Sequence, residues 1–127
     1  MNKQNLNYLK FLKELKKDKE NHIDRLNERI YESSRLKHWL LKDIEDIDAE
    51  IKEFKKKDLD YLKFLKEFKK DKENHISRVN ERIYELNRLK HLLLKDIENI
   101  EAEIQEIENK NLDYLKFLKD KENNKNI

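Results

Sequence analysis

Residues 40–54 read LLKDIEDIDAEIKEF, and the spacing of their apolar side chains is typical of an α-helix. Apolar residues recur there at alternating intervals of four and three, at Leu40, Ile44, Ile47, Ile51 and Phe54. This alternation is the heptad pattern of a coiled coil, in which one apolar stripe faces a partner helix. The stretch therefore predicts a long amphipathic helix with Lys, Asp and Glu on its solvent side.

The same alternation recurs along the rest of the chain. It returns at Tyr61, Leu65 and Phe68, at Val79, Ile83 and Leu86, and at Leu93, Ile97, Ile100, Ile104 and Ile107. A disordered chain with 46% charged residues would not space its apolar residues so regularly. The 127 residues include no Gly and no Pro, which argues against sheets with tight hairpins and against glycine-rich phosphate loops. We predict an all-α protein.

The chain is also an internal repeat. Residues 7–59 align without gaps to residues 60–112 and are identical to them at 39 of 53 positions. A third, partial copy opens with the same YLKFLK sequence at Tyr114. We predict one elongated helical domain spanning 1–127, with repeats at about 5–57 and 58–110 and a partial repeat at 111–127. A 53-residue period is seven heptads plus four residues, which predicts a stutter in each copy, near residues 26–30 and 79–83.

Three equivalent positions are candidate helix starts. Asn5, Asp58 and Asn111 each have a short side-chain oxygen that can accept hydrogen bonds from the free amides of a first helical turn. We therefore favour helix breaks near residues 57 and 110. The sequence leaves open whether the DKENH stretches at 18–22 and 71–75 are helical or are further breaks.

The charges favour a chain that folds back on itself. Each copy begins basic and ends acidic. A turn at residue 57 would place the acidic 43–53 beside the basic 62–72, and the basic 10–19 beside the acidic 96–105. We predict an antiparallel coiled-coil hairpin of two helices of about 50 residues each. An antiparallel dimer of uninterrupted helices would satisfy the same complementarity.

A short third helix is expected over roughly 112–122. After a turn near residue 110 it would lie back along the end of the second helix. That placement would bring Lys116, Lys119 and Lys121 beside Glu103 and Glu106.

The chain has more apolar surface than one partner helix can cover. Residues 39–41 and 92–94 each place three apolar side chains in succession, about 100° apart around a helix. The apolar residues of the YLKFL segment that opens each copy also span much of a helical turn. Surplus apolar surface commonly marks an interface, so we expect a homo-oligomer, most simply a dimer that forms a four-helix bundle. The alternative is that these residues only widen the intramolecular contact. The predicted interface residues are Trp39, Leu41, Leu92, Leu94, Phe11, Phe64 and Phe117.

The chain offers little chemistry for catalysis or metal binding. It has no Cys, and its four histidines do not form a His-x-x-x-His or Glu-x-x-His metal pair. The hairpin would bring Asp24 near His91, which we interpret as a polar seam position rather than as a zinc site. We expect no enzymatic activity, no cofactor and no metal.

Nucleic acid is a weaker candidate partner. The sequence pI is about 8.6, but the net charge is only +2. Candidate phosphate contacts are Arg25, Arg29, Arg78 and Arg82, although we favour their pairing with neighbouring glutamates, and the only concentrated basic patch is the lysine run 55–57. We do not expect direct nucleic-acid binding.

No segment is apolar enough to cross a membrane and the start of the chain has no signal-peptide core, so a cytoplasmic location is the default.

Three functions follow from these features. The leading hypothesis is a non-enzymatic structural or interaction protein, a self-associating helical scaffold or spacer. The first alternative is a small bacterial or phage regulator or inhibitor that binds a protein partner through its exposed apolar faces. The second alternative is a helical protein associated with nucleic acid.

Overall fold

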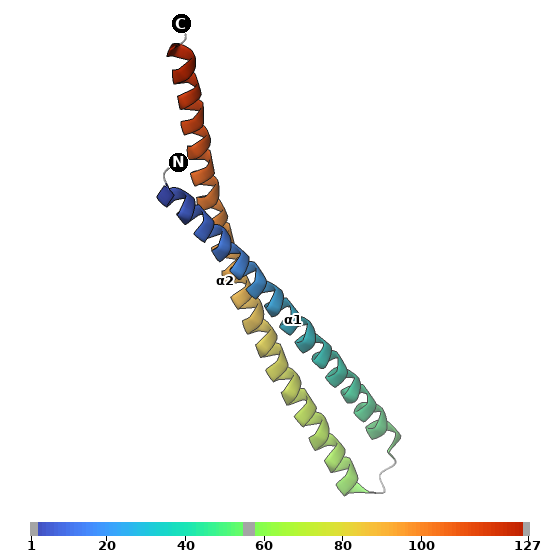
Figure 1. Cartoon of the computed structure of the whole chain (residues 1–127). Helices are drawn as coiled ribbons and strands as arrows, with labels where there is room; N and C mark the ends of the chain where they lie inside the picture. Colours follow the sequence, from blue (N-terminus) through green and yellow to red (C-terminus); the bar gives the residue numbers. More distant parts are fainter. Residues whose placement is uncertain (1–2, 55–57, 126–127) are drawn as a thin grey trace. The chain divides into compact units, whose positions relative to one another are not determined.

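The computed structural model describes residues 3–54 and 58–125, which form two long α-helices (Figure 1). Helix α1 spans Lys3–Glu53 and helix α2 spans Leu59–Lys125. The two helices pack against each other, so the all-α prediction is confirmed. Both DKENH stretches lie inside the helices and break neither of them.

The predicted helix break near residue 57 is confirmed. Helix α1 ends at Glu53, and Asp58 caps the start of α2. The Oδ1 atom of Asp58 accepts hydrogen bonds from the backbone amides of Asp60 at 3.1 Å and of Tyr61 at 3.2 Å. These are the amides that an N-cap side chain satisfies. The rings of Phe54 and Tyr61 lie 5.3 Å apart on either side of the turn, whereas the lysine run 55–57 lies outside the described residues.

The predicted third helix is wrong, because α2 continues through Asn111 to Lys125 without a break. Asparagine in a helix interior costs less than about 1 kcal/mol. Ending the helix there would instead leave the carbonyl groups of its last turn without helical partners. Of the two glutamates expected beside a third helix, Glu103 accepts a hydrogen bond from Tyr8 and Glu106 pairs with Lys110 of its own helix.

The packed helices form two compact units, and each unit contains one segment of α1 and one of α2. The hairpin unit is Arg25–Lys90, which includes the turn. The terminal unit consists of Met1–Asp24 and His91–Ile127. In each unit the two helical segments run antiparallel (Figure 1).

The seam between the helices follows one uninterrupted heptad phase. Every position of a three-four alternation is buried or half-buried, from position 9 to 51 in α1 and from 62 to 111 in α2. Lysines occupy six of these positions, namely Lys16, Lys19, Lys37, Lys69, Lys72 and Lys90. The stutters predicted near 26–30 and 79–83 are therefore wrong. The apolar pattern lapses where lysines take seam positions, because a lysine can bury its aliphatic stem and keep its ammonium group in water.

The core consists of the apolar seam positions. Its most enclosed members, each 5% exposed or less, are Leu12, Leu26, Leu40, Leu65, Val79 and Leu93. Tyr61 and Phe68, which the sequence pattern places in the seam, are 37% and 40% exposed. The seam passes through Leu65, Lys69 and Lys72 instead, so Phe68 lies beside it and stacks on Phe64 at 5.9 Å.

Candidate interaction surface

Three contacts between the helices recur in both units at positions one repeat apart. The terminal unit contains Tyr8–Glu103, Lys16–Glu101 and Lys19–Asp96. The hairpin unit contains their equivalents, Tyr61–Glu50, Lys69–Asp48 and Lys72–Asp43. In both units the basic first half of one copy contacts the acidic second half of the other, as the charge layout predicts. The recurrence shows that the register is a property of the repeat.

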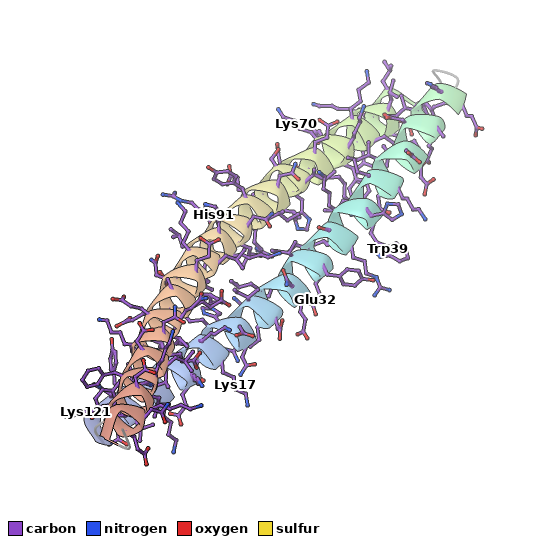
Figure 2. All side chains as sticks on the ribbon, turned by 90° about the horizontal axis from the view of Figure 1, so that it is seen from above. Lys17, Glu32, Trp39, Lys70, His91 and Lys121 are labelled. Atoms are coloured by element: carbon purple, nitrogen blue, oxygen red, sulfur yellow. The ribbon has the colours of Figure 1, made fainter. Side chains whose placement is uncertain are left out.

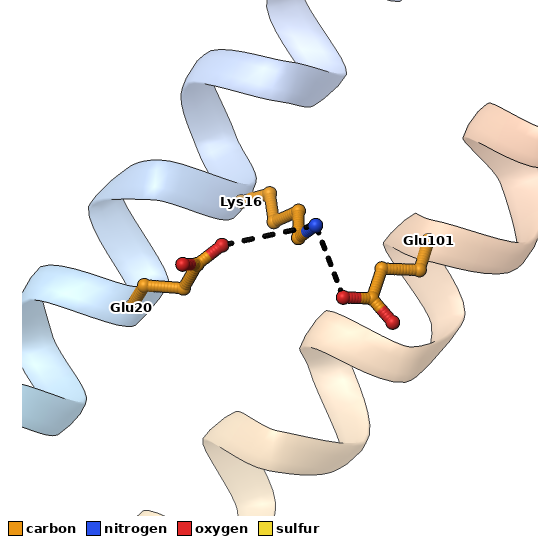
Figure 3. Close-up of polar contacts among 3 residues, drawn as sticks. All are labelled: Lys16, Glu20 and Glu101. Atoms are coloured by element: carbon orange, nitrogen blue, oxygen red, sulfur yellow. Dashed lines mark ion pairs between the residues drawn. The ribbon is translucent and has the colours of Figure 1, made fainter.

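Lys16 lies between two carboxylates (Figure 3). Its Nζ is 3.0 Å from Glu101 across the seam and 3.9 Å from Glu20 one turn along α1. The hydrogen bond to Glu101 is the main reason that the pKa of Lys16 lies above its ordinary value. Lys69 is held in the same way by Asp48 at 2.7 Å and Glu73 at 3.8 Å, and its pKa is raised chiefly by the hydrogen bond to Asp48.

The two apolar triplets each bury one residue and expose two. In the first triplet Leu40 is 4% exposed, whereas Trp39 is 56% and Leu41 43% exposed. In the second triplet Leu93 is 5% exposed, whereas its neighbours Leu92 and Leu94 are 52% and 43% exposed. Successive helical residues point about 100° apart, so one partner helix covers only the middle residue. Trp39 extends from α1 in the hairpin unit, and the Nζ of Lys42 lies 5.8 Å from the centre of its ring (Figure 2).

The aromatic openings of the copies are also exposed. Phe11, Phe64 and Phe117 are 55%, 57% and 59% exposed. The Tyr8–Phe11 and Tyr61–Phe64 ring pairs have the same geometry, 6.3 Å between centroids and 23° between planes. All seven predicted interface residues thus lie on the surface. Trp39, Leu41 and Phe64 belong to the hairpin unit, and Phe11, Leu92, Leu94 and Phe117 belong to the terminal unit.

Sequence reasoning missed a further pair of exposed aromatic residues. Tyr31 and Tyr84 are repeat equivalents in the hairpin unit and are 67% and 68% exposed. The signal was available in the heptad phase, because each tyrosine directly follows a seam isoleucine, Ile30 or Ile83. Its side chain is therefore directed away from the seam.

The four candidate phosphate-binding arginines all lie in the hairpin unit, and only two of them line a common cavity. This cavity of about 460 Å³ is lined by Arg29, Glu32, Ser33, Arg82 and Leu86. Arg25 and Arg78 are not among its lining residues. The expected arginine–glutamate pairs do not form within 3–54 and 58–125, where every cross-helix and same-helix ion pair uses a lysine.

The described part of the chain contains no group of three or more His, Asp or Glu side chains placed to hold a metal ion. Neither of its helices has a stretch long and apolar enough to cross a membrane.

The surface is thus a repeated set of exposed apolar and aromatic side chains beside a charge-paired seam. No protein-family model, curated protein or solved structure matches the chain.

Proposed function

We propose that the protein is a non-enzymatic coiled-coil scaffold or spacer that associates with a second copy of itself through its exposed apolar faces. The observation that carries this proposal is the exposure of both flanks of each apolar triplet. Trp39 and Leu41 remain in water although their neighbour Leu40 is buried. Large apolar patches on a folded surface usually mark a site of association.

The repeat favours a second copy as the partner. Each apolar patch occurs at least twice in one chain, since Trp39 and Leu41 have the equivalents Leu92 and Leu94. A two-fold dimer places the same patch of both subunits at one interface, so a patch that is present several times gives several self-complementary contacts. Two hairpins packed in this way would form a four-helix bundle.

The test is sedimentation velocity over a wide concentration range. We expect a wild-type dimer, and we expect Trp39→Glu with Leu41→Glu to raise the dimer dissociation constant by at least about 100-fold, because central aromatic anchors contribute most to such interfaces. Leu92→Glu with Leu94→Glu tests the second patch.

A matched control is Ser34→Glu with Asn87→Glu, which adds two charges at exposed, repeat-equivalent polar positions. It should remain dimeric, and circular dichroism should show that all variants keep their helices. A wild-type protein that stays monomeric at its highest soluble concentration would contradict the proposal. So would apolar-patch variants that dimerise as well as the control.

A further inference from the structure

The cavity in the hairpin unit lies at the one seam position where the two copies differ most in size. Ser33 and Leu86 are repeat equivalents, as are Arg29 and Arg82. Where copy two fills the seam with a leucine, copy one has only a hydroxymethyl group. The resulting cavity of about 460 Å³ is within the size range of small-molecule sites.

Ser33 is the one buried polar residue among the described side chains, at 8% exposure. Its hydroxyl makes no hydrogen bond to any residue within 3–54 and 58–125. No side-chain nitrogen or oxygen among the described residues is both buried and without a hydrogen-bond partner, so this hydroxyl is open to solvent. Because Ser33 lines the cavity, its hydroxyl can donate a hydrogen bond to a molecule bound there.

The surroundings of the cavity carry uncompensated positive charge. Residues 25–37 and 78–90 each contain four cations and only two carboxylates, and together they contain all six arginines of the chain. None of these eight cations forms an ion pair with another described residue, whereas the lysines near both ends of the seam are paired. Glu32 also lines the cavity, which leaves two guanidinium groups against one carboxylate.

We infer that this cavity binds a phosphate group, as inorganic phosphate or as a small phosphomonoester. The guanidinium groups of Arg29 and Arg82 would each present two N–H donors to the phosphate oxygens, and the Ser33 hydroxyl would donate a third contact. The planar guanidinium fork matches phosphate oxygens well, and such charge-assisted hydrogen bonds are stronger than neutral ones. A small anion is favoured over a polynucleotide because the donors converge on one cavity. The site lies within one chain and does not depend on the proposed self-association.

The experiment is isothermal titration of the full chain with sodium phosphate, against sodium chloride at matched ionic strength. We expect saturable binding with one site per chain. Arg29→Gln and Arg82→Gln should each weaken it by about tenfold or more, the loss of a hydrogen bond to a charged group. Arg25→Gln is the matched control, since Arg25 is an arginine of the same unit that does not line the cavity, and it should bind within about twofold of the wild type.

Ser33→Leu tests the cavity itself. It places in copy one the residue that copy two already has, so the helices should keep their circular dichroism signal while phosphate binding is lost. The inference is overturned if phosphate gives no saturable signal beyond chloride, or if Arg25→Gln weakens binding as much as the cavity variants do. It is also overturned if short single-stranded DNA binds and the cavity variants bind that DNA unchanged, because the positive charge would then serve a polynucleotide on the open surface.

Discussion

Leu26 and Val79 occupy the same place in the two copies and are the most completely enclosed side chains, at 1% and 2% exposure. Both lie in the hairpin unit, whose core also contains Leu40 and Leu65. As the most enclosed residues of this core, Leu26 and Val79 are expected to contribute strongly to its stability. Their replacement therefore tests the seam at the scale of a single residue.

Leu26→Ala should lower the free energy of unfolding by about 2–5 kcal/mol, the range for removing a fully buried leucine side chain. Urea denaturation followed by circular dichroism measures this change. Leu36→Ala is the control, because Leu36 is 36% exposed and its truncation should cost less than about 1 kcal/mol. Equal losses for the two variants would show that Leu26 does not lie in the seam.

At the scale of the helices, the pairing of each basic first half with an acidic second half sets the register. Each pairing is repeated at an equivalent position, as in Lys16–Glu101 and Lys69–Asp48. These side chains are solvent-accessible, and exposed ion pairs add little stability individually. Their effect is on specificity, because a shift by one heptad in one direction would place Lys16 opposite Leu94 instead of Glu101, and the ion pair would be lost.

The tyrosine–glutamate contacts give this pairing a pH dependence. The hydrogen bond from each phenol to its carboxylate, Tyr8 to Glu103 and Tyr61 to Glu50, is the main cause that raises the tyrosine pKa above 10.0. The stabilisation from these bonds is fully present below pH 10 and is lost as the pH rises through the raised pKa of the folded state.

Glu103→Gln with Glu50→Gln should therefore move the titration of two of the five tyrosines to lower pH. Ultraviolet absorbance of tyrosinate during an alkaline titration measures the change. Tyr8→Phe with Tyr61→Phe serves as control, since it should remove the same two late-titrating groups from the wild-type curve. Superimposable curves for the wild type and the glutamine variant would contradict the assignment.

At the scale of the whole chain, the third copy differs from the other two in the exposure of its described side chains after Asn111. Residues 112–123 are all exposed, including the large side chains of Leu112, Leu115 and Phe117. The same YLKFLK sequence is partly buried in copies one and two, where Leu12 and Leu65 are 3% exposed. The burial of a YLKFLK segment therefore depends on whether the acidic second half of another copy packs against it.

Removal of residues 112–127 should leave both units folded. We expect the thermal midpoint, measured at high dilution, to change by less than about 2 °C, because residues 112–123 contribute no buried side chain. Removal of residues 97–127 is the contrasting variant, since it deletes Glu101 and Glu103 together with the buried Ile97 and Ile100. It should destabilise the terminal unit severely. A large loss on the shorter truncation would show that the third copy packs against the rest of the chain.

Much of the fold was predictable because its signals are local or strictly repeated. The heptad spacing, the absence of Gly and Pro and the Asp58 cap predict two helices and the turn between them. The charge layout predicts the register. The exposure of Trp39 and Leu92, which flank the buried Leu40 and Leu93, could be predicted from helical geometry alone.

The sequence by itself thus determined the all-α class, the helix start at Asp58 and the charge complementarity of the two copies, which fits antiparallel pairing within one chain or between two chains. Only the tertiary structure decided the rest. Asn111 resembles Asp58 as a cap, but α2 continues through Asn111 to Lys125. Half-buried lysines occupy seam positions, so the heptad phase of each helix is continuous. The spacing of the apolar residues alone suggested a stutter. The cavity beside Ser33 exists because two equivalent positions of unequal size meet across one seam, a difference in volume that only packing makes visible.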